Sequence, residues 1–214
     1  TTSGFMVFRV PSFTSCPYDA VSSFALEGVY ISLGTLSAKI GDAAGSGLAV
    51  LRKKFPSGKK HVDYGIKDAK LSILRKIFLE SRDSGYDSKA YKNFERSNDY
   101  WLDDFALFKA LKVYHQGRPW YEWADAYKNR EASAIELFYA KHADQIEFEK
   151  WVQWIAFTQF KEARVYAASK GLLLCGDLPI LVSRDSADVW AHPDFFKLEF
   201  AAGAPPDMYC AKGQ

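Results

Sequence analysis

Three consecutive leucines at 172–174 constrain the fold of this chain most, because no polar residue alternates with them. Such a run predicts a strand that is buried on both faces, as in a parallel sheet. Gly176, Asp177 and Pro179 follow the run. A carboxylate in this place is typical of a barrel enzyme, which presents polar groups at the C-terminal face of its strands. An aspartate that only caps the following turn is the alternative interpretation of Asp177.

The overall charge argues against two classes of partner. The 214 residues include 28 lysines and arginines against 26 acidic residues, a net charge of +2. Nothing in this balance predicts a nucleic acid or an anionic membrane as partner. No apolar run approaches the ~20 residues of a membrane-spanning helix, and the first residues lack the pattern of a secretory signal peptide. We therefore expect a cytoplasmic protein.

The cysteines and histidines do not predict a metal site. Cys16, Cys175 and Cys210 are odd in number and lack metal-ligand spacing, which fits a reduced cytoplasmic protein better than a disulfide framework. The 4 histidines lie far apart in the sequence, and none stands one helical turn from another histidine or a cysteine. The chain also contains no P-loop and no GxGxxG motif.

The patterns along the chain predict two strands with helices between them. The expected elements are a strand at 5–10, a buried segment at 21–33, a surface connection at 34–60, and helices at 61–80, 98–114, 131–142 and 147–169. Asn98 is the expected N-cap of its helix. Because strand and helix do not alternate regularly, a Rossmann sheet is not expected. We predict an α/β fold: a partial (β/α)₈ TIM barrel with a long α-helical insertion between two barrel strands.

Four motifs follow one another at fixed gaps in the C-terminal part of the chain. They are GDLPILV at 176–182, DSADVWAHP at 185–193, GAPPD at 203–207 and GQ at 213–214. In order and spacing they resemble the 4-α-glucanotransferases, which are also called amylomaltases or disproportionating enzymes. Residues 16–18 (CPY) and 22–25 (SSFA) resemble an earlier motif of that family, with Cys16 in the place of a serine.

The resemblance implies a retaining transfer of α-1,4-linked glucan segments between maltooligosaccharides, without a metal or an organic cofactor. Such a reaction needs two carboxyl groups about 5 Å apart, one as nucleophile and one as acid/base. In the family these groups lie beyond the motif that ends here at Asp207, so we expect both to be absent from this chain. The chain is then a partial and inactive piece, whose partners are α-glucan and the remainder of the barrel. Alone, with open strand edges, it is expected to aggregate or pair with itself.

On this interpretation the chain divides into three parts. Residues 1–33 hold a barrel strand and part of the sugar-binding cleft, and 34–145 form a mainly helical insertion. Residues 146–214 hold a long helix, the second barrel strand and a loop that covers the cleft.

The resemblance also assigns three substrate-binding residues. Asp177 is expected to organise the subsite of the reacting sugar, and Tyr18 offers a glucose unit both a ring face and a hydroxyl group. A core tyrosine is the alternative interpretation of Tyr18. Tyr209 follows Asp207 in a loop that overhangs the cleft in relatives, and Met208 stands where the family has an aromatic residue.

The motif at 185–193 is predicted to be structural. Asp185 and Ser186 are expected to cap a helix, Asp188 to lie in its first turn, and Trp190 to pack in the core. Four acidic residues elsewhere are expected to be solvated on helices: Glu80, Asp103, Asp104 and Glu122. The adjacent pair among them is a poor catalytic dyad, because neighbouring residues point to different helix faces.

Two other functions remain open from the sequence. The first is a non-catalytic helical protein that binds glucan or another protein. The second is a hydrolase of the same clan, which the ratio of transfer to hydrolysis would distinguish from a transferase.

Overall fold

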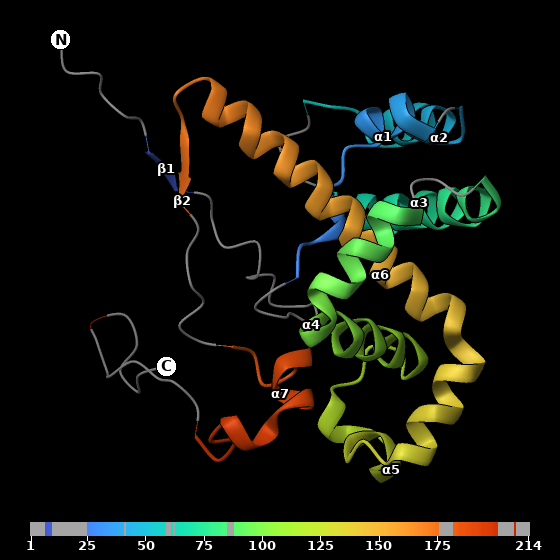
Figure 1. Cartoon of the computed structure of the whole chain (residues 1–214), viewed down its shortest axis with the longest axis vertical. Helices are drawn as coiled ribbons and strands as arrows, with labels where there is room; N and C mark the ends of the chain where they lie inside the picture. The colour runs from blue at the N-terminus through green and yellow to red at the C-terminus, as the bar shows by residue number, and fades with distance from the viewer. Residues whose placement is uncertain are drawn as a thin grey trace.

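A computed structural model describes residues 7–9, 25–40, 42–58, 61, 63–84, 88–175, 182–200 and 208 (Figure 1). The elements in chain order are β1 (Val7–Arg9), η1 (Gly28–Tyr30), α1 (Leu33–Ile40), α2 (Asp42–Lys54), α3 (Gly65–Ser84), α4 (Ser88–Tyr114), η2 (Trp120–Glu122), α5 (Asp125–Lys128), α6 (Ala132–Ser169), β2 (Leu173–Cys175), α7 (Ala187–Ala191) and η3 (Pro193–Phe195). The described part is mostly helical and does not by itself show a barrel. None of its helices is long and apolar enough to cross a membrane.

The two expected strands are present and pair in parallel. β1 lies beside β2 with Phe8 opposite Leu174, and a turn at Gly171, with φ of +74°, leads from α6 into β2. The predicted burial of β2 on both faces is wrong, because Leu173 is 56% exposed. Among the described residues the sheet has only these two strands.

Helices α4 and α6 form the centre of the helical part (Figure 1). Helix α4 begins at Ser88, ten residues before the expected start. Asn98 is therefore not an N-cap. Its amide nitrogen donates to the Phe94 carbonyl at 2.8 Å, and its amide oxygen accepts from the Trp101 indole at 3.1 Å. The helix begins earlier than expected because Tyr91 and Phe94 pack on α6, against Trp154 and Phe157.

The two helices expected at 131–142 and 147–169 are present and adjoin each other as the two parts of α6. Helix α6 runs from Ala132 to Ser169, and a kink at His142, with φ of −120° and ψ of 22°, marks the place where the sequence pattern changes. The His142 ring stacks on Phe138 at 4.2 Å between ring centroids.

The prediction of a surface connection at 34–60 is wrong, since α1 and α2 lie there. Leu36 and Leu51 are buried with α3 and α6 in one core cluster. Gly47 permits the close approach of α2 to α3, because a Cβ atom there would lie 2.5 Å from Ile73 Cγ2. The glycines that indicated a loop therefore serve helix packing instead. The helix expected near residue 61 is confirmed as α3.

Candidate functional site

The stretch that follows β2 docks on the helices rather than on the strands. We call residues 182–192 the docked segment. It contains α7, which lies next to α4 and away from β1 and β2 (Figure 1). Ligands of parallel-sheet enzymes bind outside the carboxyl ends of the strands. The docked segment follows such an end in the sequence, and the side chains that hold it in place are taken as the candidate site.

Asp185 ties the docked segment to the end of α4. Its Oδ2 lies 2.6 Å from Lys112 Nζ, and its Oδ1 accepts a hydrogen bond of 3.2 Å from the Trp120 amide. Lys112 Nζ also donates to the carbonyls of Gly117 at 2.8 Å and Arg118 at 3.0 Å. A lysine in the last turn of a helix suits this place, because the free carbonyls there attract a cation. Asp185 thus faces α4 instead of sharing the cap of α7.

The backbone next to Asp185 is held as well. The Trp120 indole donates to the Arg184 carbonyl at 2.6 Å, and the Arg184 guanidinium lies over the Tyr121 ring at 4.6 Å. One edge of η2 therefore contacts two consecutive residues of the docked segment, Arg184 and Asp185.

Ser186 stands immediately before α7. Its backbone is extended, and its hydroxyl accepts a hydrogen bond from the Val189 amide at 3.3 Å. Asp188 lies in the first turn of α7, where a negative charge is favourable.

Trp190 is the second anchor of the docked segment. Its side chain is 1% exposed, its ring packs on Phe108 at 5.6 Å, and its indole donates to the Tyr127 carbonyl at 3.0 Å. The Arg130 guanidinium lies 4.4 Å over the same ring and donates to Asp104 Oδ1 at 2.5 Å. Asp104, expected to be solvated, is therefore half of an ion pair beside Trp190.

A group of charges lies between α4 and α6. Lys150 is buried, 2.5 Å from Asp103 Oδ1 and 3.6 Å from Glu95 Oε1, so Asp103 too has a partner. Burial lowers the pKa of Lys150, but the hydrogen bond and charge of Asp103, together with Tyr139 and Glu95, raise that pKa by more, so the ammonium stays charged. Burial raises the pKa of the Glu149 carboxyl above its ordinary value, against the opposing effect of Lys109.

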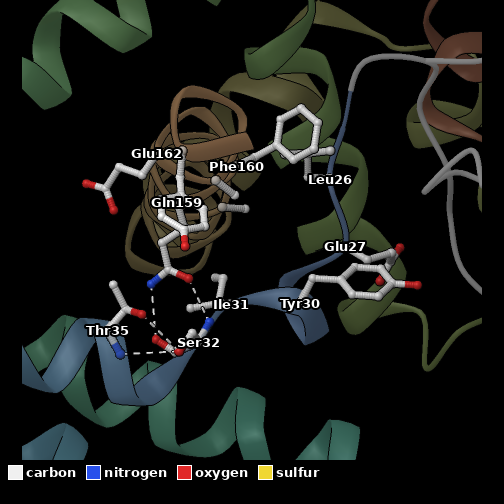
Figure 2. A pocket seen from close by; sticks show the side chains of 12 residues that line it. Leu26, Glu27, Tyr30, Ile31, Ser32, Thr35, Gln159, Phe160 and Glu162 are labelled. Atoms are coloured by element: carbon white, nitrogen blue, oxygen red, sulfur yellow. Dashed lines mark hydrogen bonds between the residues drawn. The ribbon is translucent and has the colours of Figure 1, made fainter. Parts of the chain in front are cut away.

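A cavity of about 470 Å³ separates η1 from the C-terminal half of α6 (Figure 2). Figure 2 shows Gln159 reaching from α6 to Ser32, where its amide accepts from the backbone nitrogen at 2.6 Å and donates to the carbonyl at 3.1 Å. Gln153 holds Leu26 in the same way, at 2.8 Å for both bonds. Two glutamines thus hold the described part, 25–33, of the segment expected to be buried at 21–33, and Tyr30 within it is nevertheless 63% exposed.

The substrate-binding residues assigned from the sequence cannot be placed in this geometry. Tyr18, Asp177 and Tyr209 lie outside the described residues, as does Asp207 of the structural motif, and Met208 is exposed. Among the described residues no group of His, Cys, Asp or Glu side chains is arranged to hold a metal ion.

The sequence interpretation missed the three residues that hold the docked segment from the other side: Lys112, Trp120 and Arg130. Lys112 carried a local signal, a basic residue in the last helical turn before a glycine. Its pairing with Asp185 spans 73 positions, a separation at which no sequence pattern pairs residues.

The comparison with protein families decides the identity of the chain. Residues 6–214 match the family model described as 4-alpha-glucanotransferase. The chain belongs to the 4-alpha-glucanotransferase family. The resemblance drawn from the motifs at 176–214 is therefore confirmed.

Individual members of the 4-alpha-glucanotransferase family are similar to this chain over most of its length. The chain is 34% identical over 208 residues to the 4-alpha-glucanotransferase of Thermus thermophilus, covering 92% of this chain and 40% of that one. It is 34% identical over 203 residues to the 4-alpha-glucanotransferase DPE2 of Oryza sativa subsp. japonica, covering 94% and 21%. The chain thus spans less than half the length of these relatives.

A solved structure resembles this one. It is the amylomaltase from Streptococcus agalactiae in complex with acarbose, with a TM-score of 0.76 and 25% sequence identity, covering 97% of this chain and 44% of that one.

Proposed function

We propose that the protein acts as a 4-α-glucanotransferase, which moves α-1,4-linked glucan segments between maltooligosaccharides in the cytoplasm. The observation that carries this proposal is the family match over residues 6–214. In the retaining reaction a carboxylate attacks the anomeric carbon while an acid protonates the departing sugar oxygen. The 4-hydroxyl of an acceptor then attacks the glucosyl ester and gives its proton to the group that first served as the acid. The nucleophilic carboxylate is thereby freed.

The nucleophile and the acid/base are proposed to lie outside these 214 residues. The extra length of the relatives supports this assignment, because the chain covers only 40% of the Thermus thermophilus protein. The share of the reaction that remains for this chain is to bind and orient the glucan.

The strands β1 and β2 are proposed to be two neighbouring strands of a (β/α)₈ barrel. Their parallel pairing supports this, since parallel neighbours need a crossover, and α6 supplies its last part. We keep the division into 1–33, 34–145 and 146–214, although the second boundary falls inside α6, just after the kink at His142.

Three side chains are proposed to contact the glucan. Asp177, which follows β2 in the sequence, would orient the reacting sugar, and Tyr18 and Tyr209 would offer ring faces to neighbouring units. The acarbose complex of the amylomaltase from Streptococcus agalactiae supports an α-glucan-like ligand for the family.

Incubation of the full-length protein with maltotriose tests the proposal. Transfer yields glucose and maltopentaose without an increase in total reducing ends. Asp177→Asn should lower the rate by a factor on the order of 10², because the negative charge near the reacting centre is lost. Asp194→Asn, an exposed aspartate of η3, is the matched control and should react like the wild type.

Two results would contradict the proposal. A steady rise in reducing ends would indicate a hydrolase instead. Unchanged maltotriose, under conditions in which the protein is folded, would favour a non-catalytic binding protein.

A further inference from the structure

A second cavity lies where α7 and η3 meet the middle of α4. Its volume is about 290 Å³, near the lower end of the roughly 300–1,000 Å³ of small-molecule sites. Helix α4 contributes Tyr100, Trp101 and Asp104 to its walls, α7 contributes Asp188, and the stretch 192–196 contributes the rest. We call it the α4–α7 cavity.

Two aromatic rings line the α4–α7 cavity and are nevertheless largely in water. Phe195 is 82% exposed and Tyr100 is 62% exposed. The Phe195 ring is held in place, because it stacks on the His192 ring with 5.5 Å between centroids and 21° between planes. Its backbone amide also donates to the His192 carbonyl at 3.1 Å. A supported ring that is still exposed offers its surface to the apolar face of a ligand.

The buried side of the cavity is rigid. Trp101 is 5% exposed, and its indole donates to Asn98 Oδ1 at 3.1 Å. Its ring packs on Phe105 at 5.9 Å and on Phe157 of α6 at 5.8 Å, while Phe196 packs against the same core cluster. The cavity is therefore formed before any ligand arrives, which lowers the ordering cost of binding.

The charges of the cavity select among classes of ligand. Asp104 and Asp188 line it, and none of the described residues that line it is a lysine or an arginine. Arg130 reaches it only as the ion-pair partner of Asp104 Oδ1. An anion would be repelled by the carboxylates, and a purely apolar ligand would displace their water without replacing its hydrogen bonds.

A neutral sugar meets both requirements. Its hydroxyl groups donate to carboxylate oxygens, and the C–H face of its ring packs on an aromatic ring. We propose that the α4–α7 cavity binds a short stretch of α-glucan, stacked on Phe195 and Tyr100 with hydroxyl groups donating to Asp104 and Asp188. The cavity itself indicates a neutral sugar; the identification of that sugar as α-glucan rests on the proposed function.

The test titrates the full-length protein with maltose and follows the imidazole signal of His192 by NMR. The signal is assigned through its loss in His192→Gln. Because His192 lines this cavity, its shift reports occupancy there, whatever other sites bind maltose. We expect a saturable shift with a Kd on the order of 1 mM, since a small cavity with exposed rings buries little of its ligand.

Removal of either ring should weaken binding. Phe195→Ala and Tyr100→Ala are each expected to raise the Kd for maltose at least about tenfold, because a stacking surface is lost. Phe195→Trp keeps a ring and should bind within about threefold of the wild type. Both side chains are largely exposed, so the alanine variants should fold with a nearly unchanged melting temperature.

Matched controls separate the cavity from the surface in general. Phe200→Ala removes another exposed ring, which does not line the cavity, and should leave the Kd unchanged. Asp188→Asn should weaken binding, because a charged acceptor becomes neutral. Asp99→Asn, at an exposed position of α4 outside the cavity, should not.

Several results would overturn the proposal. The site is refuted if maltose causes no saturable shift up to about 50 mM, or if both alanine variants stay within about twofold of the wild type. A tighter response to tetramethylammonium than to maltose would make this a cation site. Equal affinity for cellobiose would refute the assignment to α-glucan.

Failure of the cavity and failure of the proposed function are distinguishable. Conversion of maltotriose by a wild type whose His192 signal does not respond to maltose refutes the cavity alone. A saturable response in a folded wild type that does not convert maltotriose refutes the proposed function alone.

Discussion

The helical centre and the strand pair differ in how deeply their side chains are buried. On α4, Leu102, Phe108 and Leu111 are fully buried, and the aromatic rings of α4 meet those of α6 and α7 within 6 Å. In the strand pair Leu173 is 56% exposed, and three residues of each strand are described. Because two such strands by themselves are at best marginally stable in water, we infer that in the described part of the chain the helices supply the stability.

The docked segment belongs to the helical side of this contrast, although it follows β2 in the sequence. Trp190 is in the same core cluster as Phe108 and Trp123, whereas Leu173 and Leu174, the residues of β2 whose side chains are described, are in neither cluster. Fixing a loop on the more stable of two neighbours is the way an enzyme keeps a site rigid.

The largest expected effect is the loss of an aromatic ring from the helical core. Phe108→Ala should lower the free energy of unfolding by about 3–5 kcal/mol, since Phe108 lies against both Trp123 and Trp190. Urea unfolding of the chain measures this. Leu173→Ala is the matched change in the strand pair and should cost less than about 1 kcal/mol, because its side chain is already half in water. Equal losses would break the contrast.

A smaller effect is expected from the charges between α4 and α6. Lys150→Met leaves Asp103 and Glu95 without their cation and should cost about 1–3 kcal/mol, less than for a fully buried pair because both carboxylates reach solvent. Thermal unfolding measures it. Lys141→Met, an exposed lysine on the same helix, should change stability by less than about 0.5 kcal/mol. A neutral Lys150→Met would show that the group adds no stability.

The cap of α7 is expected to contribute about 1 kcal/mol. Ser186→Ala removes the hydroxyl that accepts from the Val189 amide, the ordinary loss for an N-cap serine. Chemical denaturation should show this loss, together with a wider spread of Trp190 fluorescence lifetimes. Ser133→Ala, on the exposed start of α6, is the comparison and should be neutral. An unchanged midpoint for Ser186→Ala would mean that packing alone holds α7.

The smallest expected effect is on the pH dependence of the free energy of unfolding. Burial raises the pKa of Glu149 above its ordinary value of 4.5, so the folded protein holds this proton more tightly than the unfolded chain does. Its stabilising contribution is therefore full below pH 4.5 and is lost as the pH rises through the folded-state pKa. Glu149→Gln, which keeps an acceptor for Gln145, should make the decline of stability above pH 4.5 shallower.

Some decline remains in that variant, because burial also raises the pKa values of Glu27 and Glu95. Glu136→Gln, at an exposed position, should follow the wild-type curve. An identical slope for Glu149→Gln and wild type would contradict the assignment to Glu149.

Local patterns predicted the elements whose signal is contained in a few neighbouring residues. Ile66, Ala69 and Ile73 recur at helical spacing and indicated α3, and the leucines at 172–174 indicated β2. The helices α1 and α2 were missed because their glycines and serines are typical of loops. In α2, Gly47 is needed for the approach to Ile73, a reason that exists only after the helices have packed.

In the candidate site, too, local motifs predicted some features and gave no sign of the long-range contacts. Consecutive motifs identified the family and indicated that Ser186 would precede a helix and that Trp190 would pack. The Lys112–Asp185 pair and the Arg130–Trp190 contact join parts of the chain 73 and 60 positions apart. A sequence without relatives beside it carries no sign of such pairing.

Hydrogen exchange of the wild-type chain tests most directly whether the docked segment is held by the helices. We predict that the amides of Trp120 and Trp190, which donate to Asp185 and Ser186, exchange at least about tenfold more slowly than the amides of β2 and approach the rates of α4. If the Trp120 and Trp190 amides exchange as fast as those of β2 while α4 stays protected, the helices do not hold the segment and the account is wrong.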